Sequence, residues 1–251
     1  MTPRFRIISF IAVLALAGIA IFLFFFHPMK LPTMAAPFTN VTYSFGPPPS
    51  ADGASYGVNF ETADQSAPLG DDVRVLTIGS LTEGPHVVGK AITQGTPLSD
   101  SAATYFEKKF PLPVTHIGFE VALPPGGGQN TAAAMVIADG PLPNDFSDPR
   151  KPNFGVHLVI TPLQWELGVW PAGGTLDVIA AGVFDTRKYA GPVRYEIFRD
   201  GSTVRIVQPD GKVAEVSDDR IGEFSGNWGV WELFQNGRGT PSPLIGSWWA
   251  Q

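Results

Sequence analysis

The chain has 251 residues, a net charge of −6 and no cysteine. Its negative charge disfavours a nucleic-acid-binding function, because binding to phosphates requires a basic surface. The absence of cysteine excludes disulfide scaffolds, thiolate zinc sites, iron–sulfur clusters and cysteine nucleophiles. The length fits either one large all-β domain or two small domains.

The first predicted element is a transmembrane helix over residues 7–26, an apolar run of 20 residues. A helix of this length spans about 30 Å, which matches the hydrocarbon core of a bilayer. Arg4 and Arg6 precede the run, and no acidic residue occurs before Asp52. Positive charge beside a membrane span favours the cytoplasmic side. We therefore expect residues 1–6 in the cytoplasm, a single pass through the cell (inner) membrane, and an extracytoplasmic, periplasmic remainder.

A cleaved signal peptide is the alternative interpretation of the same run. The apolar region of a signal peptide is about 7–15 residues long and is followed by small residues. This run is longer and ends in bulky phenylalanines, although Thr33-Met34-Ala35 offers a weak cleavage motif. Both interpretations place the rest of the chain outside the cytoplasm, and the length favours a retained helix.

One face of the predicted helix is a candidate partner-binding surface. Ala15, Gly18 and Phe22 recur at the spacing that places them on one side of a helix. Small residues at such positions let a second transmembrane helix approach closely. A simple preference for alanine in an apolar segment explains the same residues, so both interpretations stay open.

Residues 27–72 are rich in Pro, Gly, Ser and Ala and are predicted to form an extended linker with one strand at 39–45. From residue 73 onward, short β-type runs recur between Gly and Pro turn signals. The segment 99–109 fits a helix or a strand equally well. The predicted strands cover 73–78, 114–123, 132–138, 154–160, 163–170, 175–183, 193–199, 203–207, 213–216 and 226–234.

This spacing of strands predicts the fold class. Strands recur about every ten residues without a fixed repeat, which favours a two-sheet sandwich over a propeller or a solenoid. Their number exceeds that of an immunoglobulin domain. We therefore expect an all-β, two-sheet antiparallel jelly-roll sandwich at residues 73–235, followed by a C-terminal tail at 236–251.

A family resemblance supports this fold. Residues 193–234 contain hairpin turns at Asp200-Gly201 and Asp210-Gly211, followed by the aromatic-rich run GNWGVWELF. This pattern resembles the C-terminal half of concanavalin-A-like (laminin-G-like) jelly rolls. The whole layout is similar to single-pass envelope proteins of actinobacteria, among them an accessory subunit of a mammalian-cell-entry (Mce) type lipid importer. The resemblance implies a non-catalytic binding or scaffold role in an envelope transport complex, with other membrane subunits as partners.

Two further functions stay open: an envelope-glycan-binding lectin-like module and a glycoside hydrolase. Endoglucanases of this fold resemble one another in a Glu-x-Asp-x-x-Glu strand, and this chain has no such strand. Glu166 and Glu232 each stand alone between a tryptophan and a leucine. A hydrolase would therefore need a non-standard pair of carboxylates that meet in space. We expect neither residue to act in catalysis and assign no catalytic residue.

Metal ligands are not expected either. His86, His116 and His157 lie on separate predicted strands, without the short spacing of a metal-binding pair. The acidic run Asn144-Asp145-Phe146-Ser147-Asp148 is the strongest calcium candidate, and its residues are equally typical of an ordinary loop. We predict no metal and no cofactor.

Tryptophans are the remaining candidates for a binding surface. Trp165 and Trp170 are five residues apart and Trp228 and Trp231 are three apart, so the members of each pair face opposite sides of a strand. One member should pack in the core, and the other could stack on a sugar or contact a protein. The adjacent Trp248-Trp249 near the end should pack on the domain, a partner or the bilayer interface.

Overall fold

The structure is a computed structural model that describes residues 41–45, 55–63, 69–70, 72–124, 129–142, 155–170, 176–189 and 191–251. The helix predicted over 7–26, with its face of Ala15, Gly18 and Phe22, lies outside these residues, as does the acidic run at 144–148. In the described parts of the chain, no helix has the length and apolar character that crossing a membrane requires.

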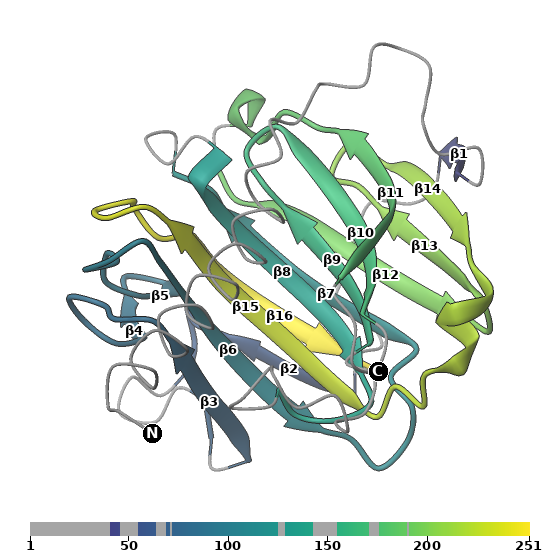
Figure 1. Cartoon of the computed structure of the whole chain (residues 1–251), viewed down its shortest axis with the longest axis horizontal. Helices are drawn as coiled ribbons and strands as arrows, with labels where there is room; N and C mark the ends of the chain where they lie inside the picture. The colour runs from purple at the N-terminus through teal and green to yellow at the C-terminus, as the bar shows by residue number, and fades with distance from the viewer. Residues whose placement is uncertain are drawn as a thin grey trace, which may run out of the picture. The chain divides into compact units, whose positions relative to one another are not determined.

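Among the described residues, nine strands form sheet A (Figure 1). Their order is β1-β14-β13-β12-β7-β16-β5-β4, and β2 also pairs with β16. The strands are β1 (Val41–Phe45), β2 (Tyr56–Asn59), β4 (His86–Val88), β5 (Ala91–Thr93), β7 (His116–Ala122), β12 (Val193–Asp200), β13 (Thr203–Val207), β14 (Lys212–Ser217) and β16 (Leu244–Ala250).

Seven strands within the described ranges form sheet B, in the order β11-β10-β9-β8-β15-β6-β3. They pair antiparallel throughout, as the strands of sheet A do, which confirms the predicted two-sheet antiparallel sandwich. The strands are β3 (Val73–Ile78), β6 (Ser101–Lys109), β8 (Thr131–Ala138), β9 (Gly155–Ile160), β10 (Gln164–Trp170), β11 (Asp177–Val183) and β15 (Trp228–Asn236). The ambiguous segment 99–109 is therefore a strand. Two short 3₁₀ helices connect strands: η2 (Thr186–Lys188) and η3 (Asp219–Glu223).

Stacked aromatic rings join the two sheets. Trp231 of sheet B and Trp248 of sheet A stack with their ring centroids 5.0 Å apart and their planes 13° apart. Phe106 and Phe60 contact Trp248 at 5.1 and 5.0 Å. The indole N–H of Trp231 donates a hydrogen bond to the Gly118 carbonyl across the sandwich, at 3.1 Å. All of these rings are buried, so they supply much of the apolar area that stabilises the fold.

The sandwich extends beyond the boundaries that the sequence predicted. Residues 244–250, assigned to a tail, form β16, which pairs with β7, β5 and β2 inside sheet A. Trp248 lies in the core, and Trp249 packs on the opposite face of sheet A, each with 1% of its surface exposed. A Cβ at Gly118 would lie 2.4 Å from the Trp249 ring, so only glycine allows this close approach. Strand β1 confirms the strand predicted at 39–45 within the linker, and β2 is a second strand in that segment.

Truncating the full chain after Pro243 should abolish cooperative folding. The truncation removes β16, an interior strand of sheet A, together with its two buried tryptophans, Trp248 and Trp249. Losing one buried tryptophan alone costs about 3–5 kcal/mol. Chemical denaturation followed by circular dichroism measures the loss, and Ser247→Ala, a half-buried position on the same strand, serves as the control. A truncated chain with an unchanged unfolding transition would contradict this architecture.

Candidate functional site

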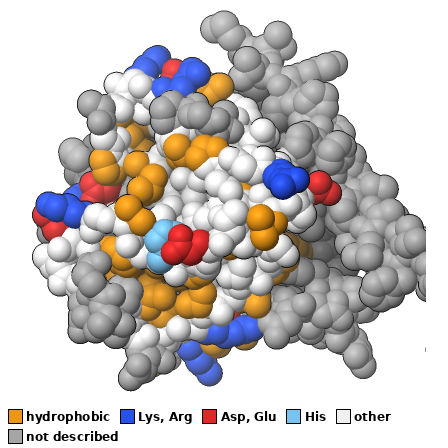
Figure 2. Space-filling model, turned by 90° about the vertical axis from the view of Figure 1, so that its left-hand side faces the viewer, with side chains coloured by type: hydrophobic (Ala, Val, Ile, Leu, Met, Phe, Trp, Pro, Cys, Tyr) orange, Lys and Arg blue, Asp and Glu red, His pale blue; other side chains and the backbone are white. Residues whose placement is uncertain are grey.

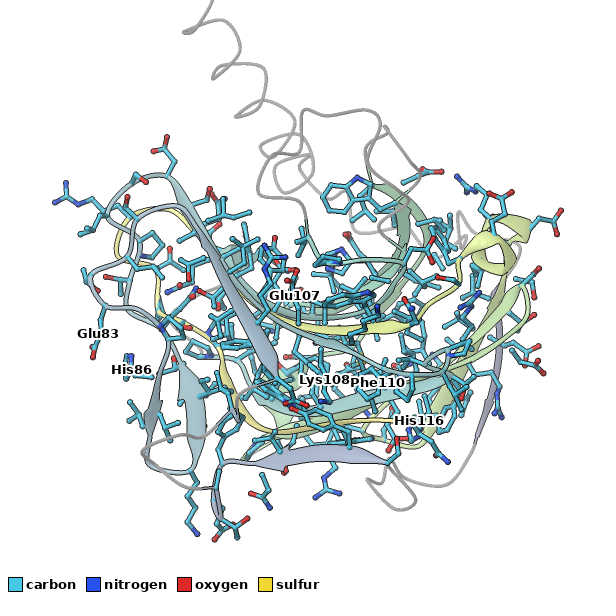
Figure 3. The ribbon with its side chains drawn as sticks, turned by 90° about the horizontal axis from the view of Figure 1, so that it is seen from below. Glu83, His86, Glu107, Lys108, Phe110 and His116 are labelled. Atoms are coloured by element: carbon cyan, nitrogen blue, oxygen red, sulfur yellow. The ribbon has the colours of Figure 1, made fainter. Side chains whose placement is uncertain are left out.

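The outer face of sheet B, turned away from sheet A, gathers ionisable side chains from several strands. Trp231 points toward sheet A, so its neighbour Glu232 points away. The register between strands places Tyr105 beside Glu232, and Glu166 in the same row. The adjacent row holds Glu107 and His157. Figure 3 shows sheet B curving, with Glu107 on its hollow side. We call this set the carboxylate face: Tyr105, Glu107, His157, Glu166 and Glu232.

Glu107 holds a segment of chain across this face. Its Oε1 accepts a hydrogen bond from the Leu142 backbone N–H at 2.6 Å, and its Oε2 lies 3.0 Å from Arg74 Nη1. The same Arg74 nitrogen donates to the Leu142 carbonyl at 3.3 Å. Asp139 fixes the other end, because its Oδ1 accepts from the Gly226 N–H at 3.0 Å. Segment 139–142 therefore passes from β8 over β15 to β6. Burial raises the pKa of the Glu107 carboxyl, against the opposing effects of the Leu142 N–H and Arg74.

Glu232 is held by two neighbours on the same face. The Nε2 atom of His157 lies 3.1 Å from Glu232 Oε2. Burial raises the pKa of the Tyr105 hydroxyl well above its usual range, and the Glu232 carboxylate beside it adds to the effect. Glu232 and His157 are 4% and 5% exposed. Among the described residues, His157 Nδ1 has no hydrogen-bond partner. This Nδ1 atom is buried, so solvent does not reach it either.

Glu166 has a different environment. It is half-buried, and its Oε1 accepts a hydrogen bond from the Gln164 side-chain amide at 2.9 Å. Burial raises the pKa of the Glu166 carboxyl, and the Gln164 amide opposes that rise. Three strand spacings separate the Cα atoms of Glu166 and Glu232 along the row, or about 14 Å. The two carboxylates have different partners, Gln164 for Glu166 and His157 for Glu232.

Sequence reasoning missed Glu107. Glu107 lies on β6, the strand next to Glu232, two residues beyond Tyr105, which is the register partner of Glu232. This diagonal position separates the Cα atoms of Glu107 and Glu232 by about 7–8 Å. Their carboxylates are nevertheless committed to different partners: Glu107 to Leu142 and Arg74, Glu232 to its histidine. From its sequence alone, segment 99–109 fits a helix or a strand. If it is taken as a strand, the alternation of side chains places Glu107 on the same face as Tyr105.

The tryptophans divide between the two faces of sheet B as their spacing predicts. Trp165 and Trp231 lie between the sheets and are fully buried. Trp170 and Trp228 have the same strand parity as Glu166 and occupy the carboxylate face, where both are half-buried.

Small residues separate the two half-buried tryptophans. The row runs from Trp228 through Ala138 and Gly155 to Trp170. Gly155 has a φ of 134°, and a Cβ there would lie 2.0 Å from the Ile137 carbonyl oxygen. A side chain is therefore excluded at Gly155, and the two half-buried tryptophans lie on either side of two buried small residues.

The other two candidate histidines, His116 and His86, lie elsewhere. His116 Nε2 lies 2.7 Å from Glu196 on the outer face of sheet A, and its ring stacks on Phe198 at 4.0 Å. His86 lies 3.6 Å from Glu83 near the β4 edge, as Figure 3 shows. Figure 2 views this end of the molecule, where hydrophobic side chains surround a histidine and an acidic side chain. Within the described ranges, no group of three His, Asp or Glu side chains could hold a metal ion.

The sequence also contains Gly53-Ala54-Ser55-Tyr56-Gly57, which matches the Gly-x-Ser-x-Gly pattern of hydrolase nucleophiles. That motif requires a sharp turn from a strand into a helix. Here Ser55 leads into the strand β2, and its hydroxyl donates to the Ala250 carbonyl at 3.3 Å. The local structure therefore does not fit a nucleophile elbow.

Comparisons with known proteins define the class of fold. No protein-family model matches the chain, and no curated protein matches it. The solved structures similar to it include the metal-free Emp46p carbohydrate recognition domain, with 10% identity, 78% of this chain and 95% of that chain covered, and a TM-score of 0.55. A legume lectin-like domain from Entamoeba histolytica has 9% identity, coverage of 77% and 96%, and a TM-score of 0.53. A galectin-like protein of unknown function from Bacillus subtilis has 15% identity, coverage of 84% and 98%, and a TM-score of 0.50. The chain has a concanavalin-A-like β-sandwich fold, of the kind found in galectins and legume lectins.

Glu107→Ala should destabilise the domain and release segment 139–142. The substitution leaves the buried Leu142 N–H without its acceptor, which costs about 1–3 kcal/mol. Hydrogen exchange should accelerate at the Gly140 and Leu142 amides, with Glu215→Ala, an exposed position on β14, as the control. Unchanged exchange at both amides would show that Glu107 does not hold this segment.

Glu166→Gln should stabilise the domain at neutral pH. Because folding raises the pKa of Glu166, the folded state binds its proton more tightly than the unfolded state does. The stability from that proton is present at low pH and is lost as pH rises through the raised pKa. The advantage of the glutamine variant should therefore shrink as pH falls toward 4.5, the ordinary value. Urea unfolding at several pH values tests this, and an advantage that grows on acidification would refute it.

Proposed function

We propose that this domain binds a glycan on the carboxylate face. The observation that carries the proposal is the presence of Trp170 and Trp228 on the same face as the Glu166 carboxylate. Sugar rings present apolar faces that stack on aromatic side chains, and their hydroxyl groups donate to carboxylates.

The class of fold supports the same function. Two of the similar structures are a carbohydrate recognition domain and a legume lectin-like domain. Identities of about a tenth relate the folds alone, so the argument for glycan binding depends on this chain's own aromatic and acidic side chains.

Binding without hydrolysis is part of the proposal. Glu107 and Glu232 lie on adjacent strands, and each carboxylate is engaged by neighbouring protein groups. A general acid must be free to give its proton to the leaving oxygen, and its partner must reach the sugar or a water. A carboxylate that accepts a backbone N–H and pairs with Arg74 is poorly placed for this role.

We also propose that the domain acts outside the cytoplasm, attached to the cell membrane by the helix predicted over residues 7–26. The support is the length of that apolar run and the arginines before it.

A second candidate function is a scaffold role in an envelope transport complex, of which an Mce-type lipid importer is the proposed example. The observation that favours it is the low exposure of the carboxylate face, where Glu107, Glu232 and His157 are almost fully buried. A protein partner can cover a face whose ionisable side chains are already buried. A glycan, in contrast, must contact the half-buried side chains of this face, which are Glu166 and the two tryptophans.

Glycan binding should be detectable with the full-length chain in detergent on an array of neutral and acidic envelope polysaccharides. Trp170→Ala and Trp228→Ala should each weaken binding at least tenfold, which equals about 1.4 kcal/mol. Tyr189→Ala, a partly exposed aromatic residue beside η2, is the control. Reducing ends should not increase during incubation.

No binding to any polysaccharide, together with co-purification of membrane proteins, would favour the scaffold function instead. Release of reducing ends that is lost in Glu232→Gln would show that the domain is an enzyme.

A further inference from the structure

The charges on the carboxylate face restrict the ligand. Arg74 lies 3.0 Å from Glu107, and His157 lies 3.1 Å from Glu232, so these two bases are already paired with acids. Lys109 pairs in register with Trp228 at the far side of the face and is exposed to solvent. In the described part of the chain, Glu166 forms no ion pair with any of these bases.

Glu166 has neutral neighbours in every direction along the sheet. Its register partners are Val159 on β9 and Ala181 on β11, and its side-chain partner is the Gln164 amide. Its half-buried position strengthens electrostatic repulsion, because the effective dielectric constant there is below that of water. A ligand carboxylate, sulfate or phosphate placed beside Glu166 would meet an uncompensated negative charge.

The same carboxylate suits a pair of hydroxyl groups. An ionised carboxylate has about four acceptor sites, and the Gln164 amide occupies one of them on Oε1. Two hydroxyls on adjacent carbons can donate to one carboxylate in the bidentate manner. Trp170 lies four residues along β10 from Glu166, about 13 Å away on the same face. One sugar ring cannot reach both, so the ligand must contain several.

We infer that the ligand is a neutral oligosaccharide of more than one sugar unit, stacked on Trp170 and donating vicinal hydroxyls to Glu166. This inference depends on the proposed glycan-binding function and adds the class of glycan. It excludes uronic acid polymers and other acidic polysaccharides as preferred ligands.

The test compares matched neutral and acidic ligands. The probes are linear glucan, mannan and galactan tetrasaccharides, together with the same chains oxidised at C6 to uronates. Isothermal titration calorimetry with the full-length chain in detergent should find a neutral tetrasaccharide that binds at least tenfold more tightly than its oxidised form. Glu166→Gln should narrow this ratio severalfold by removing the charge, whereas Glu215→Gln, exposed on sheet A, should leave it unchanged.

The possible failures are distinguishable. Tighter or equal binding of an oxidised chain would overturn the neutral-ligand inference while leaving glycan binding intact. An unchanged ratio in Glu166→Gln would overturn the role of this carboxylate. Binding of neither member of any pair would overturn the inference and count against the proposed function itself.

Discussion

The stacked pair of Trp231 and Trp248 connects the two sheets at the centre of the core. It joins the middle of sheet B to the C-terminal strand of sheet A, and the hydrogen bond from Trp231 to Gly118 fixes its orientation. Because side chains alternate along a strand, Trp231 in the core directs Glu232 to the opposite face. The packing of the core thus determines which acidic side chains reach the carboxylate face.

Burying ionisable groups on that face has a cost that the local contacts offset. An isolated carboxylate taken out of water is strongly destabilising unless it finds hydrogen bonds or an opposite charge. The Glu107 carboxylate accepts a hydrogen bond from the Leu142 N–H and lies beside Arg74, and the Glu232 carboxylate lies beside His157. Burial raises the pKa of both Glu107 and Glu166, and at Glu166 a single side-chain amide opposes that rise. Natural proteins retain such residues where function requires them, which is why the face is the candidate site.

The sequence was sufficient for local patterns and insufficient for long-range pairing. Alternation along 193–216 correctly predicted β12, β13 and β14, and tryptophan spacing correctly placed the two members of each pair on opposite faces of sheet B. Strand β16 was hidden because a register shift between Ile245 and Ser247 breaks its alternation, and turn residues precede it. The cluster of Glu107 with Glu232 was hidden because β6 and β15 are more than a hundred residues apart in the chain and pair only through the folded sheet.

Glycan binding on the carboxylate face requires that Trp170 and Trp228 contact the ligand while the core tryptophans do not. The most direct measurement records the indole N–H resonances of the full-length chain during titration with a neutral tetrasaccharide that binds. We expect shifts for Trp170 and Trp228 and unchanged resonances for Trp165 and Trp231, which lie between the sheets. Shifts confined to Trp249, on the outer face of sheet A, would instead place the binding surface on the other side of the molecule.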